Sequence, residues 1–185
     1  MNSLNAQFCR LKTHGSHLGL YPSCLKDFLK LTGYFSSHKL LCALDIGTSK
    51  CGIALSDNAK FHSIPYAVVP SKSVYSTLDS MTGKISGLVI GLPLTEKGKM
   101  GAAAERTFQI ITKSGIMDLT LPIWFQDESF TTAWAINNRN LYSRKRNYDS
   151  ISAMVILDDF LYACRAQESE SFEPMLGATS HDPVD

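Results

Sequence analysis

Residues 40–56 read LLCALDIGTSKCGIALS, two apolar runs of strand length joined by a short polar segment that contains glycine. Such a pattern predicts a β-hairpin, with strands over 40–46 and 51–56. Asp45 lies near the end of the first strand, between apolar neighbours. Burying an ionised carboxylate is costly unless its charge is compensated. Asp45 therefore either caps a turn or holds a cation.

The rest of the pattern predicts a mixed sheet covered by helices. Residues 66–69, between two prolines, are expected to form a third strand. Apolar residues from Val74 to Ile85 recur at helical spacing, and Gly87 is expected to end that helix before an apolar strand over 88–90. The further elements expected are a helix over 101–113, a strand over 121–126, a helix over 131–141 and a long helix from 149 to about 166. This order indicates an α/β fold, a three-stranded antiparallel meander followed by α-β-α-β crossovers.

The chain divides into three regions by composition. Residues 1–38 are basic and poor in acids, and we expect an extension that is partly disordered or forms a short amphipathic helix over 25–31. Residues 39–166 carry the predicted domain. Residues 167–185 are acidic and contain prolines, which is typical of a disordered tail.

Overall composition excludes several classes of protein. With 185 residues, 44% of them hydrophobic, the chain forms one domain with a real core, and its net charge of +1 gives no general attraction to nucleic acid. Five scattered cysteines favour a reducing compartment over a disulfide framework. No apolar run approaches the roughly 20 residues that span a bilayer. We expect a soluble, cytoplasmic protein without a membrane partner, or an organellar one if residues 1–38 are a presequence.

Acidic residues fall at the ends of the predicted elements. Asp45 is near the end of the first strand, Asp127 and Glu128 end the last strand, and Asp149 begins the final helix. Such positions can converge in an open α/β sheet. Three carboxylates in one place need a counter-charge, and oxygen ligands favour Mg²⁺ or Mn²⁺. Capping is the alternative role for Asp149, because the helix dipole favours an acid in the first turn.

Four segments together resemble the ordered motifs of the YqgF/RuvX family. They are residues 41–57 (LCALDIGTSKCGIALSD), 88–94 (LVIGLPL), 126–132 (QDESFTT) and 148–157 (YDSISAMVIL). The resemblance implies a ribonuclease H-like fold. Members are regarded as nucleases that trim the 5′ end of precursor 16S ribosomal RNA, and were earlier proposed as Holliday junction resolvases. By resemblance, Asp45, Glu128 and Asp149 are the catalytic and metal-binding residues.

Two departures and one ambiguity affect this site. Ser129 stands where the family usually has an arginine, so a cation that orients a phosphate is missing unless Arg139 or a residue of 144–146 replaces it. Adjacent strand residues point to opposite faces, so we expect only one of Asp127 and Glu128 to reach the metal. The resemblance favours Glu128. Thr95-Glu96-Lys97-Gly98 also replaces the usual Asn-Met-Asp-Gly.

A basic segment before the final helix is the best candidate for contact with nucleic acid. Arg139, Arg144, Lys145 and Arg146 precede Asp149, and positive charge beside an acidic metal site would hold the flanking phosphates. A solvated loop of like charges is the alternative interpretation.

The sequence as a whole predicts a metal-dependent nuclease that hydrolyses phosphodiester bonds in RNA. Its expected role is 5′-end processing of precursor 16S rRNA in ribosome biogenesis, with structured precursor rRNA as partner and a monomer or weak homodimer as its state. Two alternatives stay open, a Holliday junction resolvase, which would need a dimer, and a non-catalytic RNA-binding ribosome assembly factor, which Ser129 favours. An actin-like ATPase would need a second domain, for which the chain is too short.

Overall fold

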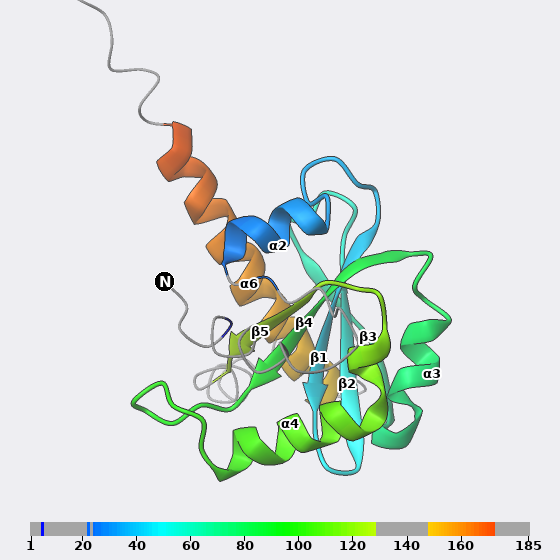
Figure 1. Cartoon of the computed structure of the whole chain (residues 1–185). Coiled ribbons are helices and arrows are strands. Elements are labelled where there is room, and N and C mark those ends of the chain that lie inside the picture. Colours follow the sequence, from blue (N-terminus) through cyan, green and yellow to red (C-terminus); the bar gives the residue numbers. More distant parts are fainter. Residues whose placement is uncertain (1–4, 6–21, 23, 129–147, 173–185) are drawn as a thin grey trace, which may run out of the picture.

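The computed structural model describes residues 5, 22, 24–128 and 148–172 (Figure 1). Its centre is a five-stranded sheet in the order β3-β2-β1-β4-β5. The strands are β1 (Leu40–Ile46), β2 (Lys50–Ser56), β3 (Ser63–Pro70), β4 (Ile85–Leu92) and β5 (Ile123–Asp127). The pairs β1–β2 and β2–β3 are antiparallel, whereas β1–β4 and β4–β5 are parallel. The predicted mixed sheet, a meander followed by crossovers, is confirmed.

Helices cover both faces of this sheet (Figure 1). One face carries α3 (Val74–Asp79) and α4 (Ala102–Ser114), with the short 3₁₀ turns η1 (Ser71–Ser73) and η2 (Ile116–Asp118). The other face carries α2 (Leu25–Leu31) and α6 (Tyr148–Phe172), and α6 lies across β1, β2, β3 and β4. No helix in the described part of the chain is both long and apolar enough to cross a bilayer.

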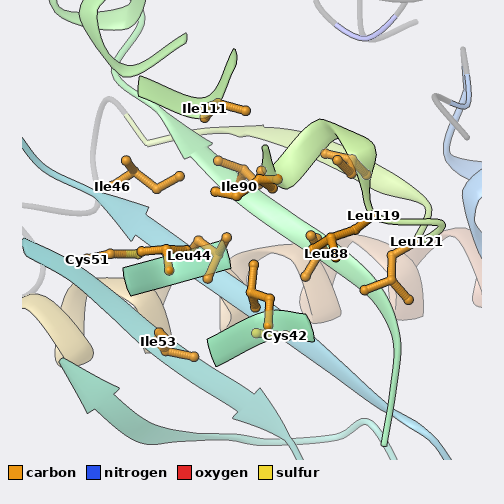
Figure 2. Packing of buried hydrophobic residues seen from close by; sticks show 14 of the residues in the cluster. Cys42, Leu44, Ile46, Cys51, Ile53, Leu88, Ile90, Ile111, Leu119 and Leu121 are labelled. Carbon is orange, nitrogen blue, oxygen red and sulfur yellow. The ribbon is translucent and has the colours of Figure 1, made fainter. Parts of the chain in front are cut away.

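The central strand β1 is apolar on both faces because helices cover both. Cys42, Leu44 and Ile46 belong to the core between the sheet and α3 and α4 (Figure 2), whereas Leu41 and Ala43 belong to the core under α2 and α6. Successive strand residues alternate between faces. Asp45 therefore lies on the face that α6 covers.

An aromatic cluster fixes α2 and α6 to the sheet. Phe160 of α6 lies 5.4 Å from Phe28 of α2, edge to face, and 6.2 Å from Trp124 of β5, between ring centroids. All three side chains are buried. Of the two forms expected for this part of the extension, the structure has the helix over 25–31, and that helix packs on the sheet.

The helix predicted from Val74 to Ile85 is shorter in the structure. α3 ends at Asp79, Ile85 opens β4, and Gly87 lies inside that strand instead of ending a helix. Gly87 is required by a contact between layers, because a Cβ there would lie 2.6 Å from the Thr32 side chain and 3.1 Å from the Phe28 ring. The apolar residues whose spacing resembled that of one helix belong to three consecutive elements, a helix, a turn and a strand, and all of them face the core.

Two other elements extend beyond their predicted limits. β3 includes both of its prolines, which is tolerated because β3 is an edge strand. α6 continues past 166 to Phe172, so a helix enters the acidic segment that was expected to be disordered. The predicted helix over 131–141, the basic segment 139–146, Ser129 and the tail from 173 lie outside the described residues.

The other edge strand, β5, is paired by a side chain. The Asn5 amide donates from Nδ2 to the carbonyl oxygen of Phe125 at 3.0 Å, and its Oδ1 accepts from the Phe125 amide at 2.9 Å. A carboxamide thereby replaces one residue of a neighbouring strand. This pairing satisfies the backbone amide and carbonyl groups of Phe125 on that edge.

Phe160→Ala should lower the free energy of unfolding by about 3–5 kcal/mol, because it removes a buried ring from the aromatic cluster. Tyr162→Ala on the same helix is the matched control, since that side chain is 70% exposed and its loss should change stability by no more than about 0.5 kcal/mol. Urea denaturation of both variants measures the difference. Equal effects would contradict the assignment of Phe160 to the core.

Candidate active site

The three acids singled out in the sequence lie at one end of the sheet. Asp45 is the next-to-last residue of β1, Glu128 directly follows β5, and Asp149 is in the first turn of α6. The backbone amide of Glu128 donates to the carbonyl oxygen of Leu92 at 3.1 Å, which holds it beside the end of β4. The carboxyl ends of parallel strands and the start of a helix thus meet, as in other open α/β sheets.

Gly52 brings the start of α6 next to Asp45. Gly52 is the direct partner of Asp45 in the β1–β2 ladder. A Cβ built on Gly52 would overlap the carbonyl group of Asp149, so the helix backbone occupies the space that a side chain would fill. One turn further along α6, the side chain of Ser152 is hydrogen-bonded to that of Asp45. The first turn of α6 therefore lies directly on the carboxylate of β1.

The electrostatics of Asp45 reflect this contact. Burial, together with the negative charge of Asp149, raises the pKa of Asp45 to about 6, and the hydrogen bond from Ser152 lowers it. Coulomb repulsion of this kind requires the two carboxylates to lie close together. The negative charge of Asp149 therefore acts on Asp45, whatever part Asp149 also has at the start of the helix.

Glu128, and not Asp127, lies on the α6 face of the sheet. Trp124 belongs to the core under α6 and Phe125 to the opposite core, so alternation places Glu128 on the α6 side. A Cβ on Gly91 of β4 would contact the Glu128 carboxylate, which shows that this glycine makes room for it. Asp127 is exposed. Burial, with the charges of Asp45 and Asp127, raises the pKa of the Glu128 carboxyl to about 8.

The donor chemistry of this site fits a hard divalent cation. Its acids offer only carboxylate oxygens, the ligands that Mg²⁺ and Mn²⁺ prefer, and the charge of Asp45 acts on Glu128 while that of Asp149 acts on Asp45. Of the three acids, Asp45 is therefore the one that interacts electrostatically with both of the others. Among the described residues, which include all three acids, no three His, Cys, Asp or Glu side chains form a preformed metal-ligand group.

Sequence reasoning missed two contributors to the site. Ser152 is not among the predicted site residues, yet its side chain is hydrogen-bonded to that of Asp45. Gly91 is also not among the predicted site residues, yet it lies within β4 and makes room for the Glu128 carboxylate. The spacing of Asp149 and Ser152, three residues apart on one helix face, was the available signal for the first. The predicted basic surface at 139–146 lies outside the part that the structure describes and stays a prediction.

Comparisons with known proteins find a matching family and several relatives in sequence. Residues 39–163 match the family described as "RuvX: Holliday junction resolvase". A protein of Ehrlichia canis named "Putative pre-16S rRNA nuclease" is 30% identical over 152 residues, which cover 77% of this chain and 94% of that protein. A Rickettsia bellii protein of the same name is 31% identical over 134 residues, 65% of this chain and 84% of the relative.

A solved structure, described as "T. thermophilus RuvC in complex with Holliday junction substrate", aligns with a TM-score of 0.45. The alignment has 10% sequence identity and covers 70% of this chain and 97% of that chain.

In the absence of divalent cations, stability should fall as pH rises. The pKa values of Asp45 and Glu128, about 6 and about 8, exceed the ordinary values near 4, so the folded chain binds more protons than the unfolded chain between about pH 4 and pH 8. The raised pKa of Asp45 alone should lower the free energy of unfolding by on the order of 3 kcal/mol across this range. Urea unfolding in EDTA at several pH values measures the slope. The slope should flatten in Asp45→Asn/Glu128→Gln, and an unchanged slope in that variant would refute the assignment.

Gly52→Ala should displace the start of α6 and lower the free energy of unfolding by about 1–3 kcal/mol, because the new methyl group meets helix backbone that cannot rotate away. Gly83→Ala is the matched control, since a Cβ at Gly83 has nothing within 4 Å. Thermal unfolding compares the two variants. Similar melting temperatures would contradict the close contact between β2 and α6.

Proposed function

The chain belongs to the RuvX family, and from this premise we propose that it is a divalent-metal-dependent nuclease that processes the 5′ end of precursor 16S rRNA. The family and the relatives are nucleases by name, so the enzyme class is a hydrolase acting on ester bonds. The observation that carries the metal dependence is the crowding of carboxylates around Asp45. Asp149 and Glu128 flank it, and burial together with neighbouring negative charge raises the pKa of Asp45 to about 6 and that of Glu128 to about 8.

Three side chains would hold the cation, Asp45, Glu128 and Asp149. When bound, Mg²⁺ or Mn²⁺ lowers the pKa of a coordinated water and stabilises the leaving oxygen of a phosphodiester. Ser152 holds the Asp45 carboxylate in one orientation through its hydrogen bond. Glu128, whose pKa is about 8, keeps a proton at neutral pH when no cation is present and releases it when one binds. Cation binding should therefore weaken as pH falls.

The competing substrate is a four-way DNA junction, because the family description names it. A precursor RNA and a DNA junction would both present phosphodiesters to the same carboxylates. The residues of the site therefore do not distinguish between the two substrates. The names of the relatives favour RNA. A non-catalytic assembly factor would keep the fold but leave the three acids without a function in cleavage.

Asp45→Asn and Glu128→Gln should each reduce Mg²⁺-dependent cleavage of a precursor 16S leader by at least about 100-fold, since each removes a charge that holds the cation. Asp127→Asn is the matched control, because that carboxylate is exposed and on the opposite side of β5, and it should retain activity within about tenfold. Cleavage of an end-labelled leader, followed by gel electrophoresis, measures all four proteins.

Equal activity of the wild type and Asp45→Asn would refute the nuclease proposal. Preferential cutting of four-way DNA junctions over the leader would replace the substrate but keep the site. Binding of the leader without cleavage under Mg²⁺ or Mn²⁺ would favour the assembly factor. Loss of activity in Asp127→Asn equal to that in Glu128→Gln would overturn the choice between these two acids.

A further inference from the structure

A pocket of about 320 Å³ lies at the end of the sheet away from the three acids. Its walls are residues 34–38, which precede β1, residues 58–61 of the turn between β2 and β3, and Arg165 of α6. Arg165 comes sixteen residues after Asp149 along α6, a distance of ~24 Å at 1.5 Å per helical residue. The pocket is therefore separate from the candidate active site but joined to it by one helix.

Hydrogen bonds between its walls hold this pocket open. The Lys60 ammonium donates to the carbonyl oxygen of Ser37 at 2.7 Å, and the Tyr34 hydroxyl donates to that of Lys60 at 3.3 Å. Arg165 donates from Nη1 to the carbonyl oxygen of Phe61 at 2.9 Å. Lys60 has a φ of 56° and is 3% exposed, an unusual backbone conformation for a lysine that these bonds maintain. The pocket is thus built in advance of any ligand.

Two aromatic rings at the pocket are presented to solvent. Phe35 is 65% exposed and Phe61 is 57% exposed. Phe35 packs edge to face on Tyr34, with ring centroids 5.0 Å apart, and the Arg165 guanidinium lies 5.8 Å from the centre of the Phe61 ring. These contacts orient both rings and leave most of their surface available for another flat group.

The charge of the pocket favours an anion. Lys60 and Arg165 line it, and none of its lining residues is acidic. The Lys60 ammonium is bound to the Ser37 carbonyl oxygen and the residue is buried, so Arg165 is the more accessible of the two cations. The nearby carboxylate of Asp57 accepts hydrogen bonds from the backbone amides of Phe61 and His62, at 2.8 and 3.3 Å. These bonds shape the turn, and the negative charge of Asp57 acts on Lys60. Exposed aromatic rings beside cations are the combination by which proteins bind single-stranded nucleic acid without reading its sequence.

We propose that this pocket is a second nucleic-acid site, which binds single-stranded RNA by stacking bases on Phe35 and Phe61 while Arg165 attracts the adjoining phosphates. The inference rests on the proposed function, since it assigns the pocket to a strand that continues from the active site. A stacked strand that covers ~24 Å contains about seven nucleotides. The pocket thus engages long single-stranded flanks and leaves short substrates unaffected.

Fluorescence anisotropy in EDTA tests the site without requiring cleavage. The probe is a labelled oligouridylate of about 20 nucleotides, longer than the roughly 16 that such sites span. Phe35→Ala/Phe61→Ala should raise its Kd at least about tenfold, because each ring supports one base. Tyr66→Ala is the matched control, since Tyr66 is 55% exposed on β3 and does not line the pocket, and its Kd should stay that of the wild type. Arg165→Gln should reduce the salt dependence of binding, the slope of log K against log salt, by about 0.7.

Unchanged binding by the double variant, or equal loss in Tyr66→Ala, would overturn the proposal. The proposal would also be overturned if the wild type were a dimer and the double substitution made it a monomer without changing RNA binding. The pocket would then be a contact between two protein chains. Because binding is measured without a cation, a failure of Asp45→Asn to abolish cleavage sinks the proposed function and leaves this result standing. Cleavage of a substrate of about 6 nucleotides should be the same in the double variant and the wild type.

Discussion

The absence of a side chain at Gly52 determines how the longest helix sits on the sheet. The carbonyl group of Asp149 occupies the position that a Cβ of Gly52 would take, directly across the ladder from Asp45. α6 is a single helix from Tyr148 to Phe172, so placing its first turn also places the residues that follow. Phe160 then reaches the aromatic cluster, and Arg165 reaches the far end of the sheet. One contact between backbone and backbone therefore positions both the acidic site and the second core.

This contact has an electrostatic cost that the rest of the fold offsets. Bringing carboxylates together in a partly buried place opposes folding, as the raised pKa values of Asp45 and Glu128 indicate. The sheet supplies the compensation because both of its faces are covered. Cys42, Leu44 and their neighbours are buried on one face, and Leu41 and Ala43 on the other. Sites that break the general rules of folding in this way are where function is expected.

Local patterns predicted the elements whose causes are local. The hairpin over 40–56 followed from two apolar runs and a glycine turn, and α4 followed from its helical period, with Gly115 in the left-handed conformation just after its end. Strand alternation indicated that only one of Asp127 and Glu128 faces the site, the family resemblance favoured Glu128, and the structure places Glu128 on the α6 side. The end of α3 could not be found in this way, because Ile85 keeps the helical spacing although it belongs to a strand. The role of Ser152 depends on Asp45, which is distant in sequence, so no local pattern carries it.

The glycines on the α6 face of the sheet share one packing role, which can be recognised only from the folded structure. At Gly52 the space is filled by the backbone of α6, at Gly87 by Thr32 and Phe28, and at Gly91 by the Glu128 carboxylate and Ile156. Each therefore marks a place where another element must come close to the sheet. Asp149 and Ser152 share one side of α6 because they are three residues apart. The orientation of α6 about its own axis therefore places two groups near Asp45. The Asp149 carboxylate raises the pKa of Asp45, and the Ser152 hydroxyl lowers it. The balance leaves Asp45 with a pKa of about 6, so at neutral pH most of this carboxylate is already ionised and available to a cation.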